Sequence, residues 1–317
     1  MDFDLARQIS IENDSKIVLL VMDGLGGLPH PGTGRTELES ARTPNLDRLA
    51  EESICGLTIP VARGVTPGSG PGHLALFGYD PLRYSIGRGV LEALGIDFEL
   101  RPDDVAARGN FCTVDSDGRV SDRRAGRIGS ELAAELCADL RAIGVDGAEL
   151  FVEAVKEHRF VLVLRGNGLS DEVADTDPQR DGLAPLPVRA TSPQGETTAR
   201  LVQGFVSEAQ RRLAAKAPAN MLLLRGFAKR PAWPSLQEVF KLNPAAVAHY
   251  PMYRGLAKLV GMTPLATGPS IQDSLATLRE HWDRFDFLFV HSKETDRAGE
   301  DGDFEAKVAA IEAMDSA

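Results

Sequence analysis

The chain has 317 residues, and two domains are the expected organisation because a single hydrophobic core rarely grows that large. Hydrophobic residues make up 43% and charged residues 26%, which is typical of a globular protein with a sizeable core. The net charge of −11 argues against nucleic acid or an anionic membrane as the main partner, although local arginines can still form a pocket for a small anion.

The N-terminal segment is polar and acidic, and the first apolar run, IVLLVM, is far too short to span a bilayer. Three cysteines are present without a C-x-x-C pair, so neither a disulfide framework nor a zinc knuckle is indicated. We therefore expect a cytoplasmic protein with no membrane partner.

The first predicted strand covers residues 17–22 and ends at Asp23 and Gly24. A helix is expected next, with Thr43 as its N-cap and Pro44 at its first position. The stretch VTPGSGPGHLALFGYDP then surrounds Ser69 with glycine and proline before it becomes apolar and helical.

Later strands and helices alternate along the chain, which predicts an α/β fold with a largely parallel sheet. Strands are predicted at 110–114, 159–166, 220–226 and 285–291, and helices at 197–215, 270–285 and 304–314. The middle of the chain is rich in charges and turns, which suggests an inserted domain. The expected boundaries are a first part over 1–95, an inserted domain over 96–188 and a second part over 189–317.

Two aspartates follow predicted strands, where ligands gather in parallel α/β sheets. Asp23 ends the first strand, and Asp296 comes just after the last. Such carboxylates suit a hard divalent ion such as Mg²⁺ or Mn²⁺. Each aspartate alone is equally compatible with a helix cap or a turn.

Ser69 has two interpretations. At a helix N-terminus it is a candidate phosphate-binding residue and nucleophile, and the proline-glycine surroundings exceed what a cap needs. The alternative is a simple N-cap. His73 follows four residues later and is as compatible with a structural role as with a functional one.

Arginines form a second group of candidates. Arg123, Arg124 and Arg127 share one short segment, and Arg165 ends a predicted strand. Arginine binds phosphate and carboxylate through two parallel hydrogen bonds, so a small substrate with two anionic groups is one reading. A solvated charged surface is the other.

Several motifs occur together in the same order as in a known family. They are VMDGLGG, ARTPNLDRLA, TPGSGPGHLALFGYDP, RGNFCTVD, DRRAGR and HSKETDRAGEDGDFEAKVAAIEAMD. In these motifs the chain resembles the archaeal-type 2,3-bisphosphoglycerate-independent phosphoglycerate mutases of the alkaline phosphatase superfamily, from about Lys16 to the last helix.

The resemblance implies a phosphatase-like domain, with a mostly parallel sheet and helices on both faces, interrupted by a smaller α/β domain. It implies an isomerase of glycolysis that interconverts 3-phosphoglycerate and 2-phosphoglycerate through a phosphoserine. It also implies two Mn²⁺ or Mg²⁺ ions and no 2,3-bisphosphoglycerate.

By the same resemblance, Ser69 is the nucleophile, and Asp23, Ser69 and Asp296 are metal ligands. The implied substrate-binding group is His73, Asn110, Arg123, Arg124 and Arg127, and Arg165 joins it by its charge and position.

The chain departs from the family pattern at two places. The family motif reads D-x-A-G-H-D-G, and its histidine is a metal ligand. This chain reads DRAGEDG, with Glu300 at the histidine position, so Glu300 is the expected replacement ligand. Family members also continue past the last helix into a strand with an Asp-His pair and a later histidine, so we expect a C-terminally incomplete chain.

Two other functions stay open. One is a phosphomonoesterase or phosphotransferase for another small phosphorylated metabolite, and the other is an inactive, ligand-binding remnant. No residue pattern indicates an oligomeric state.

Overall fold

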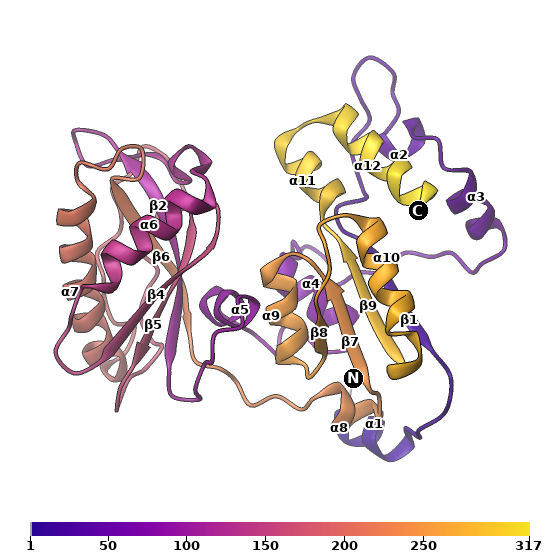
Figure 1. The fold of residues 1–317 in the computed structure, drawn as a ribbon, viewed down its shortest axis with the longest axis horizontal. Coiled ribbons are helices and arrows are strands. Elements are labelled where there is room, and N and C mark those ends of the chain that lie inside the picture. The colour runs from indigo at the N-terminus through magenta and orange to yellow at the C-terminus, as the bar shows by residue number, and fades with distance from the viewer. Residues whose placement is uncertain (1) are drawn as a thin grey trace. The chain divides into compact units, whose positions relative to one another are not determined.

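The computed structural model describes residues 2–317 and divides into two compact units (Figure 1). Unit 2 is Ser85–Trp233, and unit 1 is formed by the described residues before it together with Pro234–Ala317. Unit 2 is therefore an insertion in unit 1. Among the described residues, no helix is both long and apolar enough to cross a membrane.

Unit 2 extends beyond the expected insertion, 96–188, at both ends. Helix α5 (Arg88–Gly95) packs against two strands of unit 2, β2 (Val105–Val114) and β6 (Met221–Ala228). Strand β6 pairs with β2 although more than 100 residues separate them in sequence. The composition change near 96 and 188 thus marks loops within the unit and not its edges.

Unit 1 contains a four-stranded parallel sheet in the order β1-β9-β7-β8 (Figure 1). Its strands are β1 (Ile17–Met22), β7 (Pro244–Ala248), β8 (Thr263–Leu265) and β9 (Phe287–Ser292). Strand β9 lies between β1 and β7, and its residues 288–290 are fully buried. Such an apolar run is expected for a parallel strand covered on both faces. Strand β1 matches the predicted bounds and lies at the edge of the sheet.

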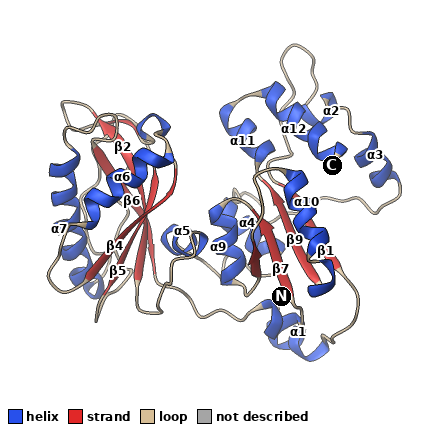
Figure 2. Cartoon of the chain, viewed as in Figure 1, coloured by secondary structure: helices blue, strands red, loops and turns tan. Residues whose placement is uncertain are grey.

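Unit 1 also contains several helices (Figure 2). They are α1 (Phe3–Ile9), α2 (Glu37–Ser40), α3 (Pro44–Glu51), α4 (Ser69–Leu76), α8 (Leu236–Phe240), α9 (Pro251–Leu259), α10 (Ile271–Glu280), α11 (Glu294–Asp301) and α12 (Phe304–Ser316), with a 3₁₀ turn, η3, at Trp282–Arg284.

The last helix is fixed to the start of α3. The Asp315 carboxylate accepts hydrogen bonds from the backbone amides of Asn45 and Leu46, at 2.9 and 2.7 Å. An acidic side chain is favourable at this position because the first amides of a helix lack backbone partners. Thr43 does not cap these amides, contrary to the simplest expectation, and its hydroxyl instead donates to Asp47.

Unit 2 contains a five-stranded sheet whose pairings are all antiparallel. The order is β3-β2-β5-β4, and β6 pairs with the other edge of β2. The remaining strands are β3 (Val120–Asp122), β4 (Glu149–Lys156) and β5 (Arg159–Arg165). The expected parallel sheet is therefore confined to unit 1, because in unit 2 β4 and β5 meet in a tight hairpin that parallel strands cannot form.

Two long helices, α6 (Ser130–Arg141) and α7 (Glu196–Leu213), belong to the hydrophobic core of unit 2. Short 3₁₀ turns lie at η1 (Ala125–Arg127) and η2 (Pro193–Gly195). Phe111, Phe160 and Phe205 are fully buried in this core. At Gly109 an added Cβ would lie 2.1 Å from the Phe160 ring, so this ring requires a glycine opposite it.

Candidate active site

The carboxyl ends of β1 and β9 lie side by side and carry the first group of polar residues. The Asp23 amide donates to the Ser292 carbonyl at 3.0 Å, which extends the strand pairing by one residue. Gly24 then turns with φ +71°, and a Cβ added there would lie 2.4 Å from the Cα of Asp296. Glycine is required for this close approach, and Asp23 and Asp296 are brought together as a result.

Ser69 is the first residue of α4, and Gly68 is the N-cap. Glycine has no side chain to bond the first amides of the helix, so a cap of that kind is absent. The interpretation of Ser69 as a simple N-cap is therefore wrong. Its hydroxyl lies at the positive end of the helix dipole, where an anion is favoured.

Tyr253, on α9, connects Ser69 with Asp23. Its hydroxyl donates to Asp23 Oδ2 at 2.5 Å and also interacts with the Ser69 side chain. Its ring centroid lies 3.6 Å from that of His291. The side chain is fully buried, and burial together with the Asp23 charge raises its pKa. Tyr253 thus remains a neutral hydrogen-bond donor that holds the Asp23 carboxylate in place.

His73 lies within the same network. Its Nδ1 is 2.8 Å from the Ser69 carbonyl oxygen. A carbonyl can only accept, so Nδ1 carries the proton and Nε2 has a free lone pair. That Nε2 atom is buried and has no hydrogen-bond partner among the described residues. Burial and the adjacent His291 lower the pKa of His73 to about 4, which keeps the imidazole neutral at neutral pH.

Asp23, His73 and His291 each offer one ligand atom within 4.8 Å of the others. His291 is the buried fifth residue of β9, and its Nε2 lies 3.5 Å from Asp23 Oδ2, too far for a good hydrogen bond. Burial alone would raise the pKa of Asp23, but contacts with His291 and Tyr253 and the Lys293 charge hold it well below its usual value. Two neutral nitrogens and one carboxylate are a donor set that fits a divalent metal ion.

Lys293 lies between the two aspartates. Its ammonium bonds to Asp296 and is 3.4 Å from Asp23 Oδ2. Burial opposes the charged form, but Asp296 and Asp23 outweigh it and raise the pKa of Lys293. Glu300 lies one helical turn after Asp296 on α11, is exposed, and acts on Lys293 only through its charge. A metal ion held by both aspartates would have to displace this ammonium.

Unit 2 presents a cationic group on the face of its sheet. Arg108 and Asn110 alternate on β2, Arg225 on β6 is the register partner of Arg108, and Arg159 on β5 is the register partner of Asn110. The pleat therefore directs all four to one face. Arg88, at the start of α5, adds its charge to theirs. We call Arg88, Arg108, Arg159 and Arg225 the arginine group.

Arg108 is the buried member of the arginine group. Arg108 is 9% exposed, and its Nε lies 3.6 Å from the buried Glu92 carboxylate. Burial lowers the pKa of Arg108 to about 10, and the three other arginines add to that shift. The Nε atom of Arg225 is buried with no hydrogen-bond partner among the described residues. Several guanidinium groups gathered on one face of a sheet in this way favour an anionic ligand.

The four arginines that the sequence analysis selected, Arg123, Arg124, Arg127 and Arg165, do not form one cluster in the structure. Arg123 bonds both oxygens of Asp177, at 2.9 and 2.7 Å, and Asp177 also contacts Arg225. Arg123 thus borders the arginine group. Arg165 bonds both oxygens of Asp104, at the opposite end of β5 from Arg159, about 20 Å along the strand. Arg124 and Arg127 are exposed around η1.

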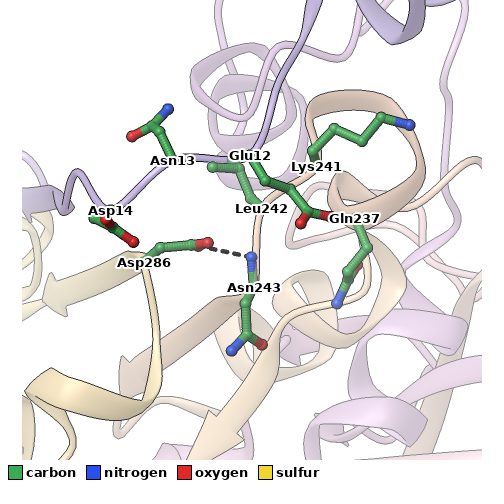
Figure 3. A pocket seen from close by; sticks show the side chains of 8 residues that line it. All are labelled: Glu12, Asn13, Asp14, Gln237, Lys241, Leu242, Asn243 and Asp286. Carbon is green, nitrogen blue, oxygen red and sulfur yellow. Dashed lines mark hydrogen bonds between the residues drawn. The ribbon is translucent and has the colours of Figure 1, made fainter.

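A hollow of about 650 Å³ lies elsewhere in unit 1 (Figure 3). Its lining residues come just before β1, β7 and β9 or from α8 and its C-cap, and they are Glu12, Asn13, Asp14, Gln237, Lys241, Leu242, Asn243 and Asp286. The hollow is therefore at the amino ends of the strands, opposite Asp23. It is lined by no residue of the nucleophile or imidazole type, so we place the active site at the carboxyl ends.

The structure thus brings Asp23, Ser69, His73 and Asp296 into one place, with Glu300 at its margin. Sequence reasoning missed Tyr253, His291, Lys293 and the arginine group. The sequence does carry a signal for two of these residues. His291 and Lys293 lie at the end of the strand predicted over 285–291, the same place that made Asp296 a candidate ligand. For the arginine group, the only sequence signal is that Arg108 and Asn110 are two residues apart on one strand, which places them on the same face. No sequence pattern points to Tyr253.

Comparisons with known proteins identify relatives along nearly the whole chain. The family model for 2,3-bisphosphoglycerate-independent phosphoglycerate mutase matches residues 50–220. A protein from Thermus thermophilus, named a probable mutase of this kind, is 50% identical over 320 residues, which cover 99% of this chain and 79% of the relative. A protein of the same name from Aquifex aeolicus is 46% identical over 99% of this chain and 79% of its own length.

Solved structures show the same relationship. The cofactor-independent phosphoglycerate mutase from Thermoplasma acidophilum has a TM-score of 0.65 and 34% identity, over 95% of this chain and 82% of that structure. A Pyrococcus horikoshii protein has a TM-score of 0.78 and 28% identity, over 95% of this chain and 76% of its own. With half of its residues identical to a named relative over nearly its whole length, the chain belongs to the 2,3-bisphosphoglycerate-independent phosphoglycerate mutase family.

Proposed function

We propose that the chain interconverts 3-phosphoglycerate and 2-phosphoglycerate through a phosphoserine at Ser69, as a step of glycolysis and gluconeogenesis. The observation that carries this proposal is the position of Ser69 at the start of α4, without a capping role, next to the Tyr253 hydroxyl that also holds Asp23. A hydroxyl at the positive end of a helix, beside a carboxylate, is suited to accept a phosphoryl group.

Each half-reaction exchanges one phosphorus–oxygen bond for another. The bond from phosphorus to the 3-oxygen of the substrate breaks as a bond to the Ser69 Oγ forms, the proton of the Ser69 hydroxyl passes to the 3-oxygen, and glycerate remains bound. The 2-oxygen then takes the phosphoryl group, and the proton of the 2-hydroxyl passes to the Ser69 Oγ, which restores the Ser69 hydroxyl. The helix N-terminus favours the phosphoryl charge throughout.

A divalent ion, Mn²⁺ or Mg²⁺, supplies a Lewis acid that stabilises charge on the transferring phosphoryl group. The residues present fit such an ion, because Asp23 and Asp296 offer carboxylates and the buried Nε2 atoms of His73 and His291 lack partners. Tyr253 orients the Asp23 carboxylate, and Lys293 balances the two aspartates when no ion is bound.

The arginine group, with Asn110 and Arg123, binds the anionic groups of the substrate. Retention of glycerate separates a mutase from a phosphatase, since early release leaves water as the only acceptor. Arginine can hold the glycerate carboxylate through two parallel hydrogen bonds while its hydroxyls exchange positions. These arginines therefore determine which product forms.

The proposal is tested by following 3-phosphoglycerate with phosphorus NMR, with Mn²⁺ and without 2,3-bisphosphoglycerate. We expect the 2-phosphoglycerate signal to appear and inorganic phosphate to stay at background. Release of inorganic phosphate without the isomer would identify a phosphomonoesterase instead. Binding of 3-phosphoglycerate by calorimetry without any turnover would identify an inactive remnant.

A further inference from the structure

The substrate of the proposed function carries a free hydroxyl as well as its anionic groups. In 3-phosphoglycerate this is the 2-hydroxyl, and in 2-phosphoglycerate it is the 3-hydroxyl. Arginine side chains only donate hydrogen bonds, so the arginine group offers no partner for the hydrogen of either hydroxyl. A hydroxyl that leaves water without finding an acceptor weakens binding. The arginine group therefore needs an oxygen acceptor beside it.

Two acceptors beside the arginine group are already used. The Oδ1 atom of Asn110 accepts a hydrogen bond from Arg108 Nε at 3.2 Å. Both carboxylate oxygens of Asp177 accept from Arg123, at 2.9 and 2.7 Å. These contacts hold the protein's own side chains in place, so we look for the acceptor elsewhere.

Glu92, on α5, has an oxygen that is not used. Its side chain is only 2% exposed, and its Oε1 atom lies 3.6 Å from Arg108 Nε. Its Oε2 atom is buried and has no hydrogen-bond partner among the described residues. A buried carboxylate oxygen without a donor is unfavourable, because burial removes the water that would otherwise bond to it. Since both oxygens belong to one carboxylate, the unpartnered oxygen also lies close to Arg108.

The packing of α5 on β2 explains why Glu92 lies there. A Cβ added at Gly89 would lie 2.2 Å from the Ala106 carbonyl oxygen, so glycine is required for this close approach. Glu92 follows Gly89 by three residues and lies on the same side of the helix. Arg108 follows Ala106 by two residues and lies on the same face of the strand. The contact of helix with strand therefore continues as the contact of Glu92 with Arg108.

Electrostatics also connect Glu92 with the arginine group. Burial lowers the pKa of Arg88 and the pKa of Arg108, and the negative charge of Glu92 opposes the shift in both. One carboxylate thus acts on two members of the group that is expected to bind the substrate. A ligand that enters this group comes close to the Glu92 carboxylate.

We propose that Glu92 Oε2 accepts a hydrogen bond from the free hydroxyl of bound phosphoglycerate and thereby selects hydroxylated substrates. The inference rests on the proposed function, because it concerns the same substrate. The arginines hold the anionic groups, and Glu92 holds the hydroxyl that is not phosphorylated. No bond is broken or formed at Glu92 and no proton is transferred to it. A site built to bond a hydroxyl discriminates against the analogue that lacks it, so Glu92 determines specificity.

The test compares two ligands by calorimetry on the full chain without added metal. One is 3-phosphoglycerate, and the other is 3-phosphonooxypropanoate, which has the same carbon chain and the same two anionic groups but no 2-hydroxyl. We expect the wild type to bind 3-phosphoglycerate about 10- to 100-fold more tightly, the range for a hydrogen bond to a charged group. Equal affinities, or no binding of either ligand, would overturn the inference.

Two variants show whether the preference arises from Glu92. Glu92→Leu removes the acceptor, so the two affinities should become nearly equal. Glu92→Gln keeps one acceptor oxygen and should retain a preference of about 2- to 10-fold, as expected for a hydrogen bond without a charge. The ratio of the two affinities is the readout, because a displaced Arg108 would affect both ligands alike. An undiminished ratio in Glu92→Leu would contradict the assignment.

Asp104 provides a matched control. It is another buried carboxylate of unit 2 that faces an arginine, since Arg165 bonds both of its oxygens. Asp104→Asn should lower the free energy of unfolding, measured with urea, and keep the affinity ratio of the wild type. Loss of the ratio in this control would overturn the assignment, because the preference would then follow from any change of a buried carboxylate.

A measurement on the wild type covers the case in which the variants fail to fold. With ¹³C-labelled glutamate, one side-chain carboxyl resonance should shift with 3-phosphoglycerate and not with 3-phosphonooxypropanoate. If no glutamate resonance distinguishes the two ligands, the inference is wrong. Formation of 2-phosphoglycerate in that case would leave the proposed function intact. Preference for the hydroxylated ligand without turnover in Mn²⁺ would instead remove the proposed function and keep Glu92 as the hydroxyl acceptor.

Discussion

Unit 1 carries its reactive side chains in the turns that follow strands, whereas unit 2 carries its arginines on the strands themselves. Asp23 and Asp296 follow β1 and β9, where parallel strands end at a common edge. Arg108, Arg159 and Arg225 lie within the antiparallel sheet, at neighbouring register positions. Under the proposed function, the first arrangement brings together a few groups for phosphoryl transfer, and the second forms a charged surface for binding an anion.

The two regions also neutralise their charges differently. In unit 1, the Asp23 and Asp296 carboxylates share the single ammonium of Lys293, and Asp23 also accepts a hydrogen bond from the neutral Tyr253 hydroxyl. In unit 2, Glu92 lies near Arg108 and Asp177 near Arg225, while burial lowers the pKa of Arg108 to about 10 and the neighbouring arginines add to that shift. Changes in unit 1 should therefore alter the rate of chemistry, and changes in the arginine group should alter substrate affinity.

The largest effect is expected from Ser69→Ala, which removes the phosphoryl acceptor. We expect kcat to fall by at least about 10⁴-fold, because no other group can take the place of a nucleophile. The change is measured by coupled assay of 2-phosphoglycerate formation, with circular dichroism to show an unchanged fold. Full activity in this variant would exclude Ser69 as the acceptor.

Arg165→Met should act on stability and not on affinity. Arg165 bonds both oxygens of Asp104, whose side chain is only 2% exposed, so the change leaves a buried carboxylate without its charged partner and with the Arg101 amide as a remaining donor. We expect a loss of roughly 2–3 kcal/mol in the free energy of unfolding, measured with urea, and an unchanged KM. A KM raised without loss of stability would return Arg165 to the substrate-binding group.

Arg225→Met should weaken substrate binding and leave stability nearly unchanged. Asp177 keeps both hydrogen bonds from Arg123 in this variant, so stability should change little. The KM for 3-phosphoglycerate should rise about 10- to 100-fold, as expected for one charge-assisted contact. Arg141→Met is the control, since Arg141 bonds Glu153 and the Val152 carbonyl away from this face. Equal KM values in the two variants would remove the arginine group from the binding account.

The smallest effect concerns pH. Burial would raise the pKa of Asp177, but Arg123 and the Gln179 amide outweigh it and hold that pKa below its usual value of 3.8. A lowered folded-state pKa contributes stability that is complete above 3.8 and is lost as pH falls through the folded value. The stability difference between wild type and Asp177→Asn should therefore shrink on acidification below pH 4, as measured by urea unfolding. A difference that grows on acidification would contradict this assignment.

The comparison of the two units also explains what could be predicted from sequence. Residues 17–22 form the parallel strand β1 as expected from an uninterrupted apolar run ended by Asp-Gly. The expectation that this strand is buried is wrong, because β1 lies at the edge of the sheet and Ile17, Val18 and Leu20 are exposed. From that strand, Asp23 and Asp296 could be placed at one edge. Ser69 could be recognised by its glycine and proline neighbours, which place it at the start of α4.

The remaining parts depend on pairings between distant segments. Arg108 and Arg225 meet only because β6 returns to pair with β2, and nothing local indicates that pairing. His291 reads as the last residue of a buried strand, and Tyr253 as one aromatic residue on a helix. The centroids of the two rings lie 3.6 Å apart, and this contact arises only from tertiary packing, so it could not be predicted from the local sequence.

The central claim is that Ser69 carries the phosphoryl group during turnover. Its most direct test is to mix the full chain with Mn²⁺ and 3-phosphoglycerate, quench with acid within the first turnovers, and analyse the peptides by mass spectrometry. The account predicts phosphate on the peptide that contains Ser69, at Ser69 itself, and none after Ser69→Ala. Formation of 2-phosphoglycerate with Ser69 unmodified at every quench time, or with phosphate on another residue, would contradict the account.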